Sequence, residues 1–209
     1  IKLDFAEAIS NERKLFEECI ESPQRQGLIH SFFAERANTK IPELKDGTPI
    51  DLKKIGIIGG GTMGTGISMA AMNAGFDVIM VEQNDEAIQK AKAKINSTYD
   101  RSVNLNRIST EQKQKIMDLF SATTDFSDLK DRDLIIEAVF ENMDVKKEVF
   151  VKLNQICSKE CILASNTSYL NVNEIASVVD DPTRVIGLHF FSPANIMKLL
   201  EVVVAKKTS

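Results

Sequence analysis

The sequence contains few of the residues that cross-link small domains or bind metals. It has no Trp, three Cys and two His among its 209 residues. The cysteines are Cys19, Cys157 and Cys161. So few cysteines, and an odd number of them, argue against a disulfide framework and fit a reducing compartment. Cys157 and Cys161 lie close together, but no second pair of ligands accompanies them, so ordinary buried thiols are favoured over a zinc site.

Long apolar runs and an excess of positive charge are also absent. No uninterrupted apolar run exceeds four residues, whereas a membrane-spanning helix needs about 20, so this stretch has no transmembrane segment. The chain carries 26 Lys and Arg against 30 Asp and Glu, a net charge of −4. A nucleic-acid binder needs a basic face, so that class of function is disfavoured. With 43% hydrophobic residues, the chain has enough apolar side chains for one full domain and an appendage.

The first 52 residues differ in pattern from the rest. Residues 1–36 show apolar side chains at helical spacing, interrupted by Pro23, so we expect two helices with the second over residues 24–36. Residues 37–52 hold Pro42, Gly47 and Pro49 among polar residues and are typical of a linker. The chain begins at Ile1 and ends just after a strand-like run. We therefore expect that it continues at both ends.

From Lys54 onwards, short apolar strands alternate with helices. Strands are predicted over residues 55–58, 76–81, 134–139, 161–164, 184–190 and 199–205. Helices are predicted over residues 62–74, 86–99, 110–119, 144–157 and 172–179. This alternation predicts an α/β domain with a mostly parallel sheet that is covered by helices on both faces.

A glycine-rich turn follows the first of these strands. Gly59, Gly61 and Gly64 satisfy the pattern G-x-G-x-x-G between a strand and a helix. In that context the first glycine permits a tight turn, the second lets the backbone approach a pyrophosphate, and the third lets helix and strand pack closely. The helix N-terminus then offers free amides to the phosphates. The alternative is a glycine-rich turn without a ligand.

Glu82 ends the second strand, where a carboxylate would bind the ribose hydroxyls of an adenine dinucleotide. Such a carboxylate also repels the 2′-phosphate of NADP. The next residues are Gln83, Asn84 and Asp85, so no arginine is present to reverse the preference. The sequence therefore favours NAD over NADP. Without the glycine turn, a solvated strand end would be the simpler interpretation of Glu82.

His189 ends a strand in the segment 187–193, Gly-Leu-His-Phe-Phe-Ser-Pro. Parallel-sheet enzymes bind ligands at the carboxyl ends of their strands, and oxidation of an alcohol by hydride transfer needs a base for the hydroxyl proton. Glu201 lies in the next strand, and a strand–turn–strand path would bring it beside the imidazole, where it would orient the ring. Because His189 stands beside phenylalanines, a structural core histidine remains the alternative.

Four segments together resemble the NAD-binding domain of the 3-hydroxyacyl-CoA dehydrogenase family. They are Ile-Gly-Gly-Gly-Thr-Met-Gly at 58–64, Ile-Glu-Ala-Val-Phe-Glu-Asn at 136–142, Ala-Ser-Asn-Thr-Ser at 164–168, and 187–193 followed by Met-Lys-Leu-Leu-Glu at 197–201. They occur in family order over residues 53–205. The resemblance implies a Rossmann-type doubly wound fold over residues 53–209 and oxidation of L-3-hydroxyacyl-CoA to 3-ketoacyl-CoA by NAD in fatty-acid β-oxidation.

The resemblance also implies roles for individual residues. The histidine that matches His189 is the base, and the glutamate that matches Glu201 is its partner. Ser168 matches a serine that contacts the cofactor side and the substrate oxygen, although a turn serine capping the following helix is the alternative. The remaining matches are cofactor contacts. Glu141 and Lys146 match family residues beside the nicotinamide half, and Lys146 is suited to ribose or phosphate oxygens. Met63 matches a residue that lies over the cofactor, and Val139 matches a backbone contact.

Ser192 departs from the family pattern, since many members have asparagine there. A serine still donates a hydrogen bond, with a shorter reach, so we include Ser192 among the candidate cofactor contacts. Serine at this position is found in multifunctional members of the family. The segments 21–25 and 32–36 resemble the helical connector (1–36) that joins an enoyl-CoA hydratase part to the dehydrogenase in these members.

The implied partners are therefore an acyl-CoA substrate, an upstream hydratase domain and the family's C-terminal helical domain, which this chain lacks. We expect the chain alone to bind NAD but to turn over poorly. The expected location is intracellular: cytoplasmic in a bacterium, peroxisomal or mitochondrial in a eukaryote. Alternative functions are a structural NAD-binding module, a dehydrogenase of another substrate class such as sugar acids, and an interaction role for residues 1–36.

Overall fold

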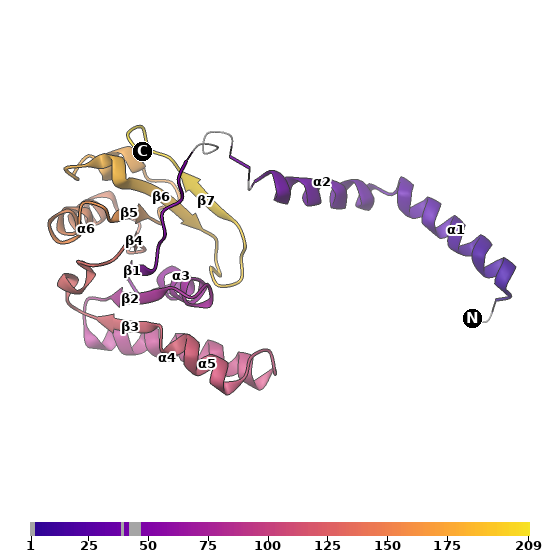
Figure 1. The fold of residues 1–209 in the computed structure, drawn as a ribbon, viewed down its shortest axis with the longest axis horizontal. Coiled ribbons are helices and arrows are strands. Elements are labelled where there is room, and N and C mark those ends of the chain that lie inside the picture. The colour runs from indigo at the N-terminus through magenta and orange to yellow at the C-terminus, as the bar shows by residue number, and fades with distance from the viewer. Residues whose placement is uncertain (1–2, 39, 42–46) are drawn as a thin grey trace. The chain divides into compact units, whose positions relative to one another are not determined.

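The computed structural model describes residues 3–38, 40–41 and 47–209. The chain divides into two compact units, Ile1–Ile50 and Asp51–Ser209 (Figure 1). Of the linker predicted over residues 37–52, residues 39 and 42–46, and Pro42 with them, lie outside the described residues. No helix in the described ranges has both the length and the apolar character needed to cross a bilayer.

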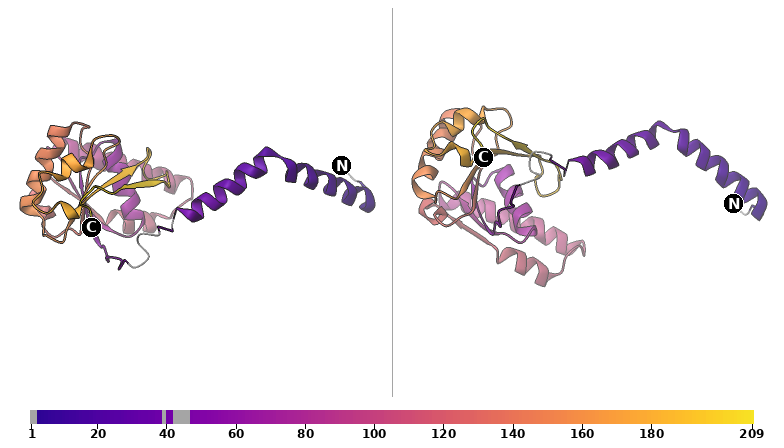
Figure 2. Two further views of the ribbon diagram at one scale, coloured as in Figure 1. Left: turned by 90° about the horizontal axis from the view of Figure 1, so that it is seen from above. Right: turned by 45° about the horizontal axis from the view of Figure 1, so that its top comes forward.

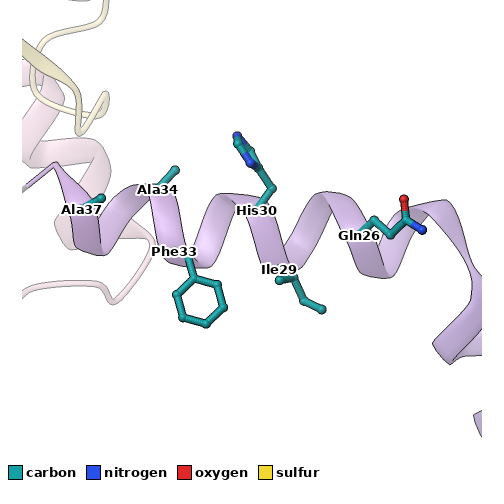
Figure 3. Close-up of a pocket in the computed structure, with 6 residues that line it drawn as sticks. All are labelled: Gln26, Ile29, His30, Phe33, Ala34 and Ala37. Carbon is teal, nitrogen blue, oxygen red and sulfur yellow. The ribbon is translucent and has the colours of Figure 1, made fainter.

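In its described residues, the first unit contains two helices, α1 (Phe5–Glu21) and α2 (Pro23–Ala37). The predicted break at Pro23 is confirmed. Ser22 caps α2 by accepting a hydrogen bond from the backbone N–H of Arg25, and Pro23 fills the first position of the helix, where its missing N–H costs nothing. Neither helix buries a residue. A shallow hollow runs along α2. Ile29 and Phe33 project to one side of this helix, and His30 projects to the other (Figure 3).

The second unit is built on one seven-stranded sheet in the order β3-β2-β1-β4-β5-β6-β7. All neighbouring strands are parallel except β6 and β7, which are antiparallel. The strands are β1 (Lys54–Ile58), β2 (Asp77–Val81), β3 (Phe120–Thr123), β4 (Leu134–Glu137), β5 (Ile162–Ser165), β6 (Val185–Phe190) and β7 (Leu200–Val203). The predicted mostly parallel α/β sheet is confirmed.

Helices cover both faces of the sheet (Figures 1 and 2). They are α3 (Thr62–Asn73), α4 (Asp85–Asn104), α5 (Thr110–Met117), α6 (Met143–Ile156) and α7 (Val172–Ala176), with two short 3₁₀ turns, η2 (Phe126–Leu129) and η3 (Pro182–Arg184). Successive strand residues serve opposite faces: Ile57 packs in the cluster with α3 and α4, and Ile58 in the cluster with α6 and α7. The strands are consequently apolar on both sides.

Several sequence predictions in this unit need correction. Strand β3 was not expected, because Phe120–Thr123 is short, polar at two of its four positions and only partly buried. The last predicted helix, over residues 172–179, ends at Ala176. The helix predicted over residues 86–99 instead continues to Asn104.

The strand order reverses between β1 and β4, since β1 connects through α3 to one side of the sheet and β4 continues on the other. Doubly wound sheets bind ligands in the crevice outside the carboxyl ends of the strands at such a point. The glycine-rich turn follows β1, and the segment 138–142 follows β4. The topology thus places both segments at this crevice.

Candidate active site

The glycine-rich turn is tight, and side chains are excluded from it. Gly59 has a φ of +95°, a conformation that favours glycine, and its N–H donates to the carbonyl of Val81 at 2.9 Å. A Cβ at Gly59 would lie 2.9 Å from the carbonyl oxygen of Ala138 in the segment after β4. At Gly64, a Cβ would overlap the carbonyl oxygen of Gly59. The turn therefore requires glycine at the first and third positions of the pattern, whereas a Cβ at Gly61 would meet no atom within 4 Å.

Helix α3 begins at this turn without a side-chain cap. Gly61 is its N-cap residue and offers no side-chain acceptor. In the described part of the chain, every other α-helix has a capping side chain, from Asp4, Ser22, Asn84, Ser109, Asn142 or Asn171. The first amides of α3, beside the half-buried Met63, are thus left for an external acceptor such as a phosphate.

Glu82 follows β2, and its carboxylate faces the glycine-rich turn. It accepts hydrogen bonds from the backbone N–H of Gly60 and, at 2.9 Å, from the N–H of Gln83. The carboxylate is thereby held at the loop rather than extended into solvent. Together, the glycine turn, the uncapped helix and this carboxylate fit a dinucleotide with an unphosphorylated adenosine ribose.

We expect Glu82→Gln to weaken NAD binding by about tenfold, because a carboxylate that accepts hydrogen bonds from the ribose hydroxyls is lost. The preference for NAD over NADP should fall by about tenfold to a hundredfold, because the negative charge that repels the 2′-phosphate is lost as well. The measurement is the Kd of this chain for both dinucleotides. The matched control is Glu86→Gln, which removes an exposed carboxylate paired with Lys90. An unchanged ratio of the two Kd values in Glu82→Gln would contradict the assignment.

His189 and Glu201 are brought together by the β6–β7 pair. They are direct cross-strand partners, and the Nδ1 atom of His189 lies 2.8 Å from Oε2 of Glu201. The imidazole side chain is 19% exposed and packs against the ring of Phe191. This is a partly open histidine with a carboxylate partner rather than a closed core residue. With Nδ1 held by Glu201, Nε2 is the nitrogen available for proton exchange with a substrate.

A buried ionic network joins β4 to α6. Glu137 at the end of β4 is 0% exposed and Lys146 on α6 is 1% exposed. The ammonium of Lys146 lies 2.8 Å from Oε1 of Glu137 and 3.0 Å from Oε2 of Glu141. Glu137 also accepts from the N–H of Val139 at 2.8 Å and from the hydroxyl of Ser165 at 2.6 Å. Lys146, expected near cofactor oxygens, thus directs its charge at two carboxylates.

Glu141 extends this network to the loop after β5. It accepts from the hydroxyl of Thr167 at 2.6 Å and from the N–H of Ser168 at 2.8 Å. Burial acts to raise the pKa of Glu141, but these hydrogen bonds and the Lys146 ammonium outweigh it and hold the pKa below its usual value. Glu141 is therefore a carboxylate at neutral pH, and it ties the segments after β4 and β5 together.

The sequence interpretation missed Glu137, Ser165 and Thr167. The available signal was a carboxylate ending the otherwise apolar strand Leu134–Glu137. The alternative of Ser168 as a helix cap is wrong, because Asn171 caps α7. Ser168 is exposed beside Glu141, and Ser192 is exposed in the turn after β6. Of the cysteines, Cys157 and Cys161 are buried free thiols and Cys19 is exposed.

Comparisons with known proteins agree with this fold. A family model described as the NAD-binding domain of 3-hydroxyacyl-CoA dehydrogenase matches residues 54–209. A peroxisomal fatty acid β-oxidation multifunctional protein of Oryza sativa is 38% identical over 203 residues, which are 96% of this chain but 28% of that protein. A 3-hydroxybutyryl-CoA dehydrogenase of Clostridioides difficile is 42% identical over 156 residues, 75% of this chain and 56% of the relative.

Among solved structures, the 3-hydroxybutyryl-CoA dehydrogenase of Escherichia coli superposes with a TM-score of 0.75 at 34% identity, covering 77% of this chain and 34% of that one. The chain therefore spans about a third or less of the rice and E. coli proteins.

Proposed function

Because the chain belongs to the 3-hydroxyacyl-CoA dehydrogenase family through its NAD-binding domain, we propose that the protein oxidises L-3-hydroxyacyl-CoA thioesters to 3-ketoacyl-CoA with NAD, in fatty-acid β-oxidation. The observation that carries the proposal is the His189–Glu201 pair, 2.8 Å apart at the carboxyl end of β6. A structural NAD-binding module would need the glycine turn and Glu82 but no histidine–carboxylate pair.

The reaction removes two electrons and two protons from the C3 alcohol. NAD, when bound, supplies a nicotinamide ring that accepts the hydride from C3. His189 accepts the hydroxyl proton at Nε2 as the C3–O bond becomes a carbonyl. Glu201 holds Nδ1 and stabilises the imidazolium that forms. Ser168 and Ser192 are proposed to hydrogen-bond to the substrate and cofactor, and Glu141 holds the Ser168 amide in place.

We further propose that the chain is the middle part of a multifunctional enzyme. The rice relative aligns with 96% of the chain, so the match includes most of residues 1–50, whereas the clostridial dehydrogenase aligns with 75%. Helices α1 and α2 are therefore proposed as the connector to a hydratase domain, with a C-terminal domain completing the acyl-CoA site. The relatives from plants and zebrafish are named peroxisomal, which favours the peroxisome if the source is a eukaryote.

The test is NADH oxidation with acetoacetyl-CoA, by this chain and by a version extended through the following domain, with NAD affinity measured on both. We expect both to bind NAD and only the extended form to turn over, because the closing domain completes the substrate site. If both bind NAD and neither turns over, the noncatalytic module is correct. Turnover of a sugar acid in place of acetoacetyl-CoA would identify a different dehydrogenase.

A further inference from the structure

Strand β6 extends beyond its neighbour β5. The last β5–β6 pair in the sheet is Ser165 with Gly187, but β6 continues to Phe190. From Leu188 to Phe190, strand β6 is paired with β7 alone, and the last pair is Phe190 with Leu200. Strand β7 is exposed along its whole length and forms the edge of the sheet. The backbone that carries His189 is thus paired with a strand on one side only.

A side chain takes the place of the missing strand on the other side. Oδ1 of Asn166 accepts a hydrogen bond from the backbone N–H of Phe190 at 2.9 Å. Asn166 is the first residue after β5 and is 9% exposed. Its own N–H donates to the carbonyl of Glu137 at 2.8 Å. Asn166 therefore joins the end of β4 to the end of β6, through its backbone on one side and its side chain on the other.

This contact acts on the peptide group that directly follows His189. Without it, the His189–Phe190 peptide would be held by the exposed strand alone, and the part-buried N–H of Phe190 would lose its acceptor. The imidazole itself is held by Glu201, which lies on that same exposed strand. A catalytic base has to stay within a fraction of an ångström of its working position, and small displacements cost large factors in rate.

We propose that Asn166 is a positioning residue for His189, fixing the backbone of the base through the hydrogen bond from Phe190 N–H to Asn166 Oδ1. This inference rests on the proposed function for its effect on rate. Its structural part is independent of that function, because it concerns the local stability of the Phe190 amide and the environment of one imidazole.

The test compares Asn166→Leu, which keeps the side-chain size without an acceptor, with Asn166→Asp, which keeps the acceptor. In this chain, the readouts are hydrogen exchange of the Phe190 amide and the NMR chemical shifts of the imidazole protons. With only two histidines in the sequence, His30 in α2 serves as an internal reference. In the extended form, the readouts are kcat with acetoacetyl-CoA and the Kd for NAD.

For Asn166→Leu, we expect the Phe190 amide to exchange about tenfold faster and kcat to fall about tenfold or more. The NMR resonances of the His189 imidazole should move while those of His30 stay in place, and the Kd for NAD should stay within about twofold. Asn166→Asp should preserve amide protection and most of the turnover. Should Asn166→Leu fail to fold, Asn166→Ala adds no bulk, and the same difference from Asn166→Asp is expected.

The matched control is Asn173→Leu. Oδ1 of Asn173 accepts from the backbone N–H of Lys206 at 2.7 Å, so this variant removes a tether of the same kind from another segment. It should leave the Phe190 amide, the His189 imidazole resonances and kcat unchanged. An unaltered Phe190 amide and unaltered His189 resonances in Asn166→Leu would overturn the proposal, as would equal losses in Asn166→Leu and Asn166→Asp. If the wild-type extended form binds NAD but lacks turnover, only the proposed function fails, and hydrogen exchange and the imidazole resonances still decide the role of Asn166.

Discussion

His189→Gln is expected to lower kcat in the extended protein by about a hundredfold to ten-thousandfold, the range that a positioned general base contributes. Glutamine can still hydrogen-bond to the substrate oxygen, but it cannot accept the hydroxyl proton. The affinity for NAD should remain unchanged, because the glycine turn, α3 and Glu82 follow strands β1 and β2. These strands lie on one side of β4 in the sheet, whereas β6, which carries His189, lies on the other. The measurement is steady-state NADH oxidation with acetoacetyl-CoA beside the Kd for NAD.

The control for this prediction is His30→Gln, which removes the other histidine of the sequence from the exposed helix α2. It should leave both kcat and NAD affinity as they are. Near-normal turnover by His189→Gln would exclude His189 as the base. A parallel loss of turnover and of NAD affinity would instead indicate that His189 supports the fold of the site.

Lys146→Met is expected to destabilise the second unit by about 3–5 kcal/mol, the usual result of removing one partner from a buried ion pair. Lys146 is 1% exposed and Glu137 is 0% exposed, so the substitution leaves the Glu137 carboxylate in the interior without its cation. The measurement is the free energy of unfolding in urea, monitored by the sheet signal. A decrease in the free energy of unfolding of less than about 1 kcal/mol relative to the wild type would show that the network tolerates the loss of Lys146.

The neighbouring lysine gives a matched control. Lys147 forms an ion pair with Glu174 at 2.6 Å, and both side chains are partly exposed, at 28% and 49%. Lys147→Met should therefore cost at most about 1 kcal/mol. The double variant Glu137→Gln with Lys146→Met should recover part of the loss, because the fully buried side chain at position 137 is then neutral and only the partly exposed Glu141 has lost its cation. Failure of the double variant to recover any stability would assign the loss to packing.

The sequence predicted the elements whose pattern is strong, and the reasons are local. The strands at residues 55–58 and 134–139 are apolar runs in a β-α-β alternation, and their type does not depend on distant contacts. The approach of His189 and Glu201 also follows from a short strand–turn–strand path. Strand β3 was missed because Phe120–Thr123 acquires its strand character from pairing with β2, which the sequence pattern does not show.

The supporting residues of the site depend on loop geometry rather than on periodicity. Glu137 and Lys146 are nine residues apart, and only the packing of α6 against β4 brings them to 2.8 Å. Asn166 meets the N–H of Phe190 across 24 residues, through a side chain in a loop. Hydrophobic pattern fixes which face of a strand is buried, but it carries no information on such polar contacts between loops.

Because β7 lies at the edge of the sheet in this chain, the His189–Glu201 pair is expected to resist local unfolding less well than the dinucleotide site does. Strand β1, which is followed by the glycine turn, and strand β2, which is followed by Glu82, have paired neighbours on both sides, whereas β7 pairs only with β6 and exposes every residue. Edge elements with few buried contacts open at lower free energy than the centre of a sheet. Fraying of β7 would take Glu201 away from His189 while the central strands stay closed. Heat or mild denaturant would then yield a form of this chain that still holds its dinucleotide but in which His189 has lost its carboxylate partner, so that loss of the His189–Glu201 pair precedes loss of cofactor binding.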